Sequence, residues 1–169
     1  LDNYYIRGVN HNISFLNALM VHPRFVDGDF TTNFIADEFP DGFNADLVVQ
    51  NDTEIAVVIA ASVHQLGCER AGLLSDQLEG HEVEPSNDWI VVVADQYRPV
   101  QVSLTDTGYL VERDGQIYHI FTEWSIGDPL FKAVINDVNV TVQEQSVATG
   151  YRLIYRGTEK NARVISPRE

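Results

Sequence analysis

The chain has 169 residues and carries 11 Lys and Arg against 25 Asp and Glu, which gives a formal net charge of −14. This length suits one domain, or one domain with part of another, and a hydrophobic fraction of 44% is enough for a globular core. Nucleic-acid binding is disfavoured because an acidic surface repels phosphates, and membrane binding is disfavoured because no basic amphipathic stretch is present.

Residues 1 to 43 predict an extended piece followed by two short helices. Asn12 is placed to cap the first helix, which Pro23 disrupts, and Thr31 or Thr32 to cap a second helix that reaches Phe39. Such small elements make a poor core of their own. The chain also begins without methionine in patterned sequence, so we expect this segment to be the end of a larger domain.

A long helix is predicted over residues 51 to about 71. Asn51 or Asp52 provides its cap, and Gly72 stands where a helix commonly stops. Between Ile55 and Val63 apolar residues occupy every side of the helix, so protein must surround it on most faces. The same Val- and Ile-rich run also fits a buried strand. The length of the segment and its polar tail favour the helix.

The connection from Leu73 to Ser86 follows this helix without a clear secondary-structure pattern. Connections of this length are uncommon in compact domains and are often functional. Its apolar residues are Leu73, Leu74, Leu78 and Val83, and they stand among acids such as Glu79. We expect these residues to contact a protein partner, with the acids adding specificity.

The chain from Asn87 onward predicts about seven or eight short strands separated by turns. The expected strands are Trp89–Ala94, Pro99–Leu104, Tyr109–Glu112, Gln116–Trp124, Asn139–Gln145, Gly150–Tyr155 and Ala162–Ile165. Asp114-Gly115 is a strong hairpin signal. Residues 116 to 124 carry apolar bulk on both faces, which indicates a strand between the core and a covered surface.

The helix and the strands predict one architecture together. So many short strands favour a closed barrel or a sandwich. The interior of a barrel must be filled, and an apolar helix must be covered by protein. We therefore predict an α+β fold in which a long central helix is encircled by an antiparallel β-barrel, with no exposed sheet edge.

No residue pattern predicts catalysis or a metal site. The five histidines lack metal-ligand spacing, and no Gly-x-Ser-x-Gly motif is present. Cys68 stands near the C-terminal end of the predicted helix, where the helix dipole does not favour a thiolate. Trp89 and Trp124 are expected to be core residues.

Two stretches near the start carry a family resemblance. "GVNHN" from Gly8 and "HPRFVDGDFTTNFI" from His22 resemble the C-terminal end of a biotin carboxylase domain in biotin-dependent acyl-CoA carboxylase α subunits, most similarly those of the propionyl-CoA carboxylase type. The resemblance continues, with fewer diagnostic residues, into the region that this family calls the BT domain. There the family has a long helix inside an antiparallel barrel.

The resemblance implies a division of the chain and a function. Residues 1–46 would end a biotin carboxylase domain, and 47–169 would form the BT domain, with a helix at about 51–71, a "hook" loop at about 73–86 and a barrel at about 88–166. In the family this domain binds the carboxyltransferase β subunit and adjoins the biotin carboxylase and biotin carrier domains. The expected contacts are therefore Leu73, Leu74, Leu78, Glu79 and Val83.

The resemblance also implies what the chain lacks. It has no glycine-rich ATP-grasp loop and no Met-Lys-Met biotin motif. Biotin, ATP and Mg are therefore expected only in a whole subunit, which would carboxylate propionyl-CoA to methylmalonyl-CoA through carboxybiotin. Thr32 and Asn33 match positions near the adenine of ATP, but they replace an isoleucine–histidine pair of some bacterial relatives. The family implies a bacterial cytoplasm or a mitochondrial matrix.

A stand-alone small-ligand-binding or hydrolytic β-barrel is the alternative. It is motivated by the strand-rich half alone. Such a barrel needs a free interior, whereas the apolar helix is expected to fill it. The occupancy of the barrel interior distinguishes the two hypotheses.

Overall fold

The computed structural model describes residues 2–6, 9, 11–43, 52–72, 86–156 and 158–167. The first of these form three short helices, α1 (Ile13–Val21), α2 (Pro23–Val26) and α3 (Phe34–Glu38). Sequence patterns predicted two. The difference arises at Pro23, which ends α1 and also occupies the first turn of α2, where proline is tolerated. Neither Asn12 before α1 nor Asn33 before α3 makes a side-chain cap bond.

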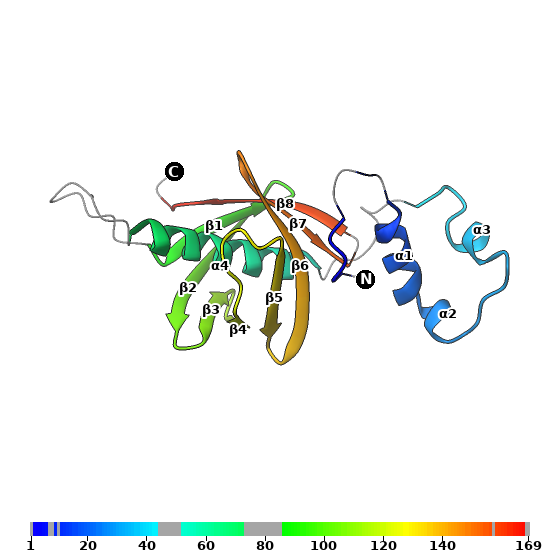
Figure 1. The fold of residues 1–169 in the computed structure, drawn as a ribbon, viewed down its shortest axis with the longest axis horizontal. Coiled ribbons are helices and arrows are strands. Elements are labelled where there is room, and N and C mark those ends of the chain that lie inside the picture. Colours follow the sequence, from blue (N-terminus) through cyan, green and yellow to red (C-terminus); the bar gives the residue numbers. More distant parts are fainter. Residues whose placement is uncertain are drawn as a thin grey trace.

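The three helices hold one another through aromatic and charged contacts. The Phe15 ring meets Phe39 edge-on with centroids 5.5 Å apart. Arg24 on α2 forms an ion pair with Glu38 on α3. The segment also contacts the second part of the chain, since Asp2 Oδ1 accepts from the Arg156 amide at 3.1 Å. Figure 1 shows these helices to one side of the barrel.

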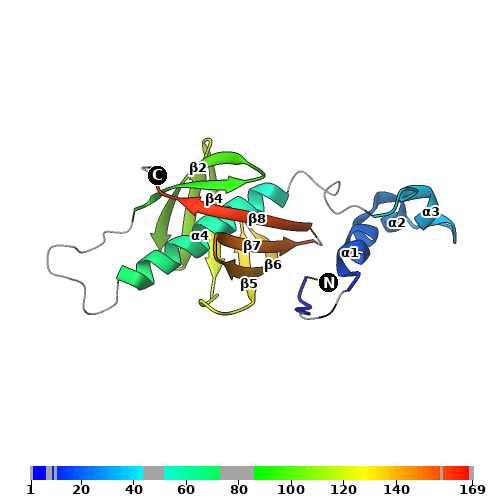
Figure 2. The same cartoon turned by 90° about the horizontal axis from the view of Figure 1, so that it is seen from above.

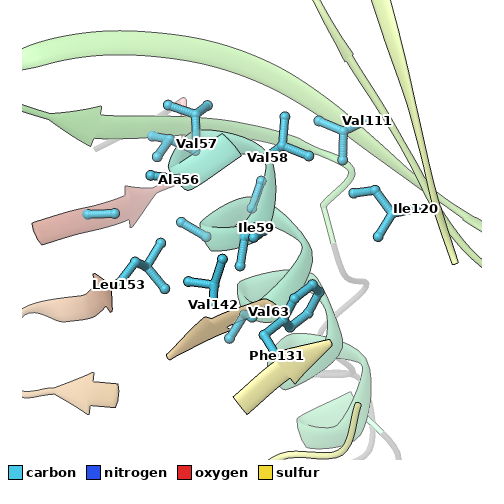
Figure 3. Close-up of a cluster of buried hydrophobic side chains, with 14 of the residues drawn as sticks. Ala56, Val57, Val58, Ile59, Val63, Val111, Ile120, Phe131, Val142 and Leu153 are labelled. Atoms are coloured by element: carbon cyan, nitrogen blue, oxygen red, sulfur yellow. The ribbon is translucent and has the colours of Figure 1, made fainter. Parts of the chain in front are cut away.

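The apolar segment whose sequence fitted either a helix or a buried strand forms the helix α4 (Asp52–Gly72). The strand interpretation is therefore wrong. Its central residues are fully buried on every side: Val57, Val58, Ile59, Ala60 and Ala61. Figure 3 shows the side chains of α4 pointing in different directions, with Val58 on the side of Val111 and Val63 on the side of Phe131. An all-round apolar helix is stable in water only when protein surrounds it in this way.

Eight antiparallel strands surround α4 in a closed barrel with the order β1 to β8. The strands are β1 (Asp88–Val93), β2 (Gln96–Thr105), β3 (Gly108–Arg113), β4 (Gln116–Thr122), β5 (Leu130–Ile135), β6 (Val138–Val147), β7 (Gly150–Tyr155) and β8 (Thr158–Ile165). Pairing of β1 with β8, for example Val91 with Val164, closes the ring. Figures 1 and 2 show α4 running through the sheet. The predicted α+β fold is confirmed.

Tight hairpins connect the strands where the sequence has short polar turns. Positive φ angles occur at Asp114 and Gly115, as the Asp-Gly signal predicted. The same geometry occurs at Ala94–Asp95 and at Asn136–Asp137. Two consecutive residues with positive φ form the turn that matches the natural twist of the flanking strands.

Three details of the strands differ from the sequence patterns. Strand β5 was not predicted, although its burial alternates, with Phe131 and Ala133 buried and Lys132 exposed. The outer face of β4 is not covered, since Ile117 and Phe121 are 48% and 46% exposed. Leu104 continues the alternation of Val100 and Val102 and is nevertheless 64% exposed.

Candidate docking site at the end of the central helix

Helix α4 changes character along its length. From Ala56 to Val63 it is buried in the barrel, whereas Leu66 to Glu69 are partly buried and Arg70 to Gly72 are exposed. The last turns therefore project out of the barrel, as Figure 2 shows. Strand β1 begins near this projecting end, because Trp89 packs edge-on against His64 with centroids 4.5 Å apart. The connection between residue 72 and residue 86 thus leaves and returns at one end of the barrel.

A polar cluster fixes the geometry of this end. The Trp89 indole N–H donates to Gln65 Oε1 at 2.7 Å, and Gln65 Nε2 donates to Glu69 Oε1 at 3.1 Å. Trp89 and Gln65 are both buried. A buried polar group is costly unless it is hydrogen-bonded, so this pair specifies the orientation of α4 relative to β1.

A second contact joins the helix to β7, which only β8 separates from β1. His64 Nδ1 lies 3.0 Å from the Tyr151 hydroxyl of β7. Burial, with smaller contributions from Cys68 and Glu144, raises the pKa of Tyr151 to about 12. The hydroxyl therefore keeps its proton at neutral pH. His64 and Gln65 together hold the emerging helix between β1 and β7.

Replacing Gln65 with methionine is expected to lower the free energy of unfolding by about 1–3 kcal/mol, because the buried Trp89 N–H loses its acceptor while the side-chain volume is nearly conserved. Urea denaturation followed by tryptophan fluorescence measures the change. Gln145→Met, on a half-buried position of β6, is the control and should change stability by less than about 0.5 kcal/mol. Equal effects of the two substitutions would contradict a specific role for the Gln65–Trp89 bond.

The other end of α4 is held by charge. Glu54 accepts from Arg98 of β2 at 2.6 Å through Oε1, and its Oε2 pairs with Arg113 of β3. Arg113 also pairs with Asp114 at 2.9 Å. The Arg98 and Arg113 side chains are mostly shielded from solvent, so these ion pairs position the first turn of α4 against strands β2 and β3. The helix is therefore anchored at both ends.

The residues predicted to contact a partner, Leu73, Leu74, Leu78, Glu79 and Val83, lie outside the described residues. The structure describes the two places from which their segment departs. Thr32 and Asn33 are exposed and lie in the turn before α3, where the Asn33 amide donates to Thr31 Oγ1 at 3.2 Å. Trp89 and Trp124 are buried as predicted.

Sequence reasoning missed one cavity beside α4, of about 390 Å³, which Glu144 lines. A signal for it was present, since Val140, Val142 and Glu144 alternate on one face of β6, and that face is buried. Elsewhere, burial and the nearby Glu69 carboxylate raise the pKa of the Cys68 thiol, which disfavours a thiolate nucleophile. Within the described ranges, no cluster of His, Cys, Asp and Glu could hold a metal ion, and no helix could cross a membrane.

Known proteins match this chain along much of its length. The family model described as "Propionyl-coenzyme A carboxylase BT domain" matches residues 57–169. The propionyl-CoA carboxylase alpha chain of Ruegeria pomeroyi is 29% identical over 170 residues, which cover 100% of this chain and 25% of that protein. The mitochondrial alpha chains of Mus musculus and Homo sapiens are 32% and 31% identical over 146 residues, and each alignment covers 85% of this chain and 20% of the relative.

The matched region and the observed architecture coincide. Residues 57–169 contain α4 from Val57 onward and the whole closed barrel. The chain spans a fifth to a quarter of the length of these relatives. It belongs to the propionyl-coenzyme A carboxylase BT domain family.

Proposed function

We propose that this chain is the docking part of an acyl-CoA carboxylase α subunit and binds the carboxyltransferase β subunit. The observation that carries this proposal is the filled barrel. Seven apolar residues of α4 occupy its interior with 4% exposure or less: Ala56, Val57, Val58, Ile59, Ala60, Ala61 and Val63. A barrel filled in this way has no central space for a substrate, and its remaining means of action are its surface and its connections.

The hook segment, residues 73–86, is the proposed contact. It departs from the projecting turns of α4 and returns at β1, and the bonds of Gln65 and His64 hold these two elements in place. A rigid base lowers the entropy lost when a loop binds a partner. Leu73, Leu74 and Leu78 would bury apolar area in the complex, and Glu79 and Val83 would complete the contact.

The reaction of the whole protein is proposed on the same basis. The relatives are named propionyl-CoA carboxylase alpha chains, and a chain of this length lacks most of their sequence. The complete subunit would use ATP, Mg and bicarbonate to carboxylate biotin for transfer to propionyl-CoA. Residues 1–46 would end its biotin carboxylase domain, with Thr32 and Asn33 near the adenine, and a biotin carrier domain would follow. It would work in a bacterial cytoplasm or a mitochondrial matrix.

A binding titration against the matching carboxyltransferase β subunit tests the docking role. The chain is expected to bind, and a variant with Leu73, Leu74 and Leu78 changed to serine is expected to lose at least about a hundredfold in affinity, because three anchoring side chains are truncated. The readout is the dissociation constant from calorimetry or interferometry.

The control variant changes three exposed hydrophobic residues of the barrel, Tyr97, Ile117 and Val138, to serine. It should bind the β subunit within about threefold of the parent, because these residues lie toward the Glu54 end of the barrel: Tyr97 adjoins Arg98, Ile117 pairs with Glu112 beside Arg113, and Val138 pairs with Ile135 at the end of β5. Equal losses in the two variants would exclude a contact centred on the hook. Failure of the folded parent to bind would exclude this chain as the docking part.

A further inference from the structure

The cavity of about 390 Å³ opens beside the C-terminal half of α4. Val63 and Gly67 of the helix form one wall, and the connection from β4 to β5 forms another through Trp124, Ile126 and Asp128. Tyr5, Glu144 and Tyr151 also line the cavity. Tyr5 comes from the N-terminal segment, so residues from distant parts of the chain meet at this place.

The cavity is lined by one buried carboxyl group, that of Glu144. Glu144 is only 7% exposed and bonds the Ser146 hydroxyl at 3.0 Å. Within the part of the chain that the structure describes, no Lys, Arg or His forms a salt bridge with it. Burial raises the pKa of the Glu144 carboxyl, and the Ser146 bond offsets this in part. A buried carboxylate without a cation is costly, so a bound cation would relieve that cost.

Three aromatic residues line the same cavity as this carboxylate. Tyr5, Trp124 and Tyr151 line the cavity together with Glu144, and Asp128 adds a second carboxylate. Aromatic rings attract cations through their negative faces, and a neighbouring carboxylate adds a charge-assisted hydrogen bond. Three aromatic rings with one buried acid form a site for a compact organic cation on an alkyl chain.

Gly67 leaves room in the helix wall. A Cβ placed at Gly67 would meet nothing within 4 Å, so the glycine is not required by close packing there. Glycine within a helix is less favourable than alanine by about 1 kcal/mol. The presence of glycine at this position is explained if a ligand occupies the space beside it.

We propose that this cavity binds an organic cation, namely a primary ammonium or guanidinium group on an alkyl stem. The stem would lie along Val63, Gly67 and Ile126, and the charged group would reach Glu144 between the aromatic rings. Such a group is presented either by a lysine or arginine side chain of a protein or by a free alkylamine. The proposal does not rest on the docking role, and its test does not depend on whether the β subunit binds.

The test is an NMR titration of the folded chain with N-acetyl-lysine-methylamide, with N-acetyl-norleucine-methylamide as the neutral ligand of matched shape. The indole N–H of Trp124, which donates to the Asp128 carbonyl at 2.8 Å, reports on the cavity. The indole N–H of Trp89 is an internal reference, because it bonds Gln65 and does not line the cavity. We expect a saturable shift at Trp124 alone, with affinity at least about tenfold higher for the lysine ligand.

Two variants separate the effect of the Glu144 charge from the effect of the space beside Gly67. Glu144→Gln keeps the side-chain shape and should weaken lysine binding about tenfold while leaving norleucine binding unchanged. Gly67→Met places an unbranched side chain in the cavity and should abolish binding of both ligands while the helix is retained. A titration with n-butylammonium and with a Gly-Lys-Gly peptide distinguishes a free amine from a protein side chain by which of them binds more tightly.

The proposal is overturned by any of three results. Equal affinities for the lysine and norleucine ligands would make the cavity an apolar site. Unchanged lysine binding in Glu144→Gln would remove the carboxylate from recognition. No shift at Trp124 in the folded parent at millimolar ligand would mean that the cavity does not bind cations.

Discussion

Replacing Gly108 with alanine is expected to lower the free energy of unfolding by about 3 kcal/mol or more, which is enough to unfold much of a marginally stable domain. Gly108 begins β3 with φ +153°, and a Cβ there would lie 1.9 Å from the Ile120 carbonyl oxygen. The contact is with backbone of the neighbouring strand, so no side-chain rotation relieves it. Strands β3 and β4 would have to separate locally, although the barrel is closed only while they stay paired.

Urea denaturation monitored by circular dichroism measures this effect. The matched control is Gly67→Ala, which adds the same methyl group where nothing lies within 4 Å. It should leave stability unchanged or raise it by up to about 1 kcal/mol, because alanine favours the helix. Gly150→Ala is expected to behave like Gly108→Ala, since its Cβ would lie 2.2 Å from the Ala162 carbonyl oxygen. A Gly108→Ala protein as stable as Gly67→Ala would contradict the close approach of β3 and β4.

Truncating Ile59 to alanine is expected to cost about 2–5 kcal/mol. Ile59 lies at the centre of α4 with 0% exposure, and strands surround it on all sides. The removed methyl groups would leave a cavity that cannot collapse, because the closed ring of strands limits how far the walls can move inward. The loss of unfolding free energy is therefore expected to lie in the upper half of this range.

The control for this prediction is Ile117→Ala on the outer face of β4, where the side chain is 48% exposed. Its cost should stay below about 1 kcal/mol and reflect the lower strand preference of alanine. Chemical denaturation of the two variants under identical conditions gives the comparison. If Ile59→Ala lost no more than Ile117→Ala, α4 would not be the core of the barrel.

The sequence by itself determined the central helix and the barrel around it. The stretch from Ile55 to Val63 is apolar on all sides, and a helix of that kind has one physical requirement, enclosure by protein. Period-two alternation indicated most strands, and Asp114-Gly115 indicated one hairpin. These features are local, since a few consecutive residues contain the whole signal. The resemblance in the first 43 residues also rested on local motifs.

The tertiary structure alone decided which surfaces became covered. Strand β5 pairs with β4 on one side and β6 on the other, and these pairings decide which face of it is buried, the face of Phe131 and Ala133. The outer face of β4 remains exposed although its residues are apolar, because no other described element packs there. Glu144 lines one cavity with Tyr5, Trp124 and Tyr151, which come from other segments of the chain. Burial depends on contacts between distant segments, and composition and periodicity along the chain do not contain that information.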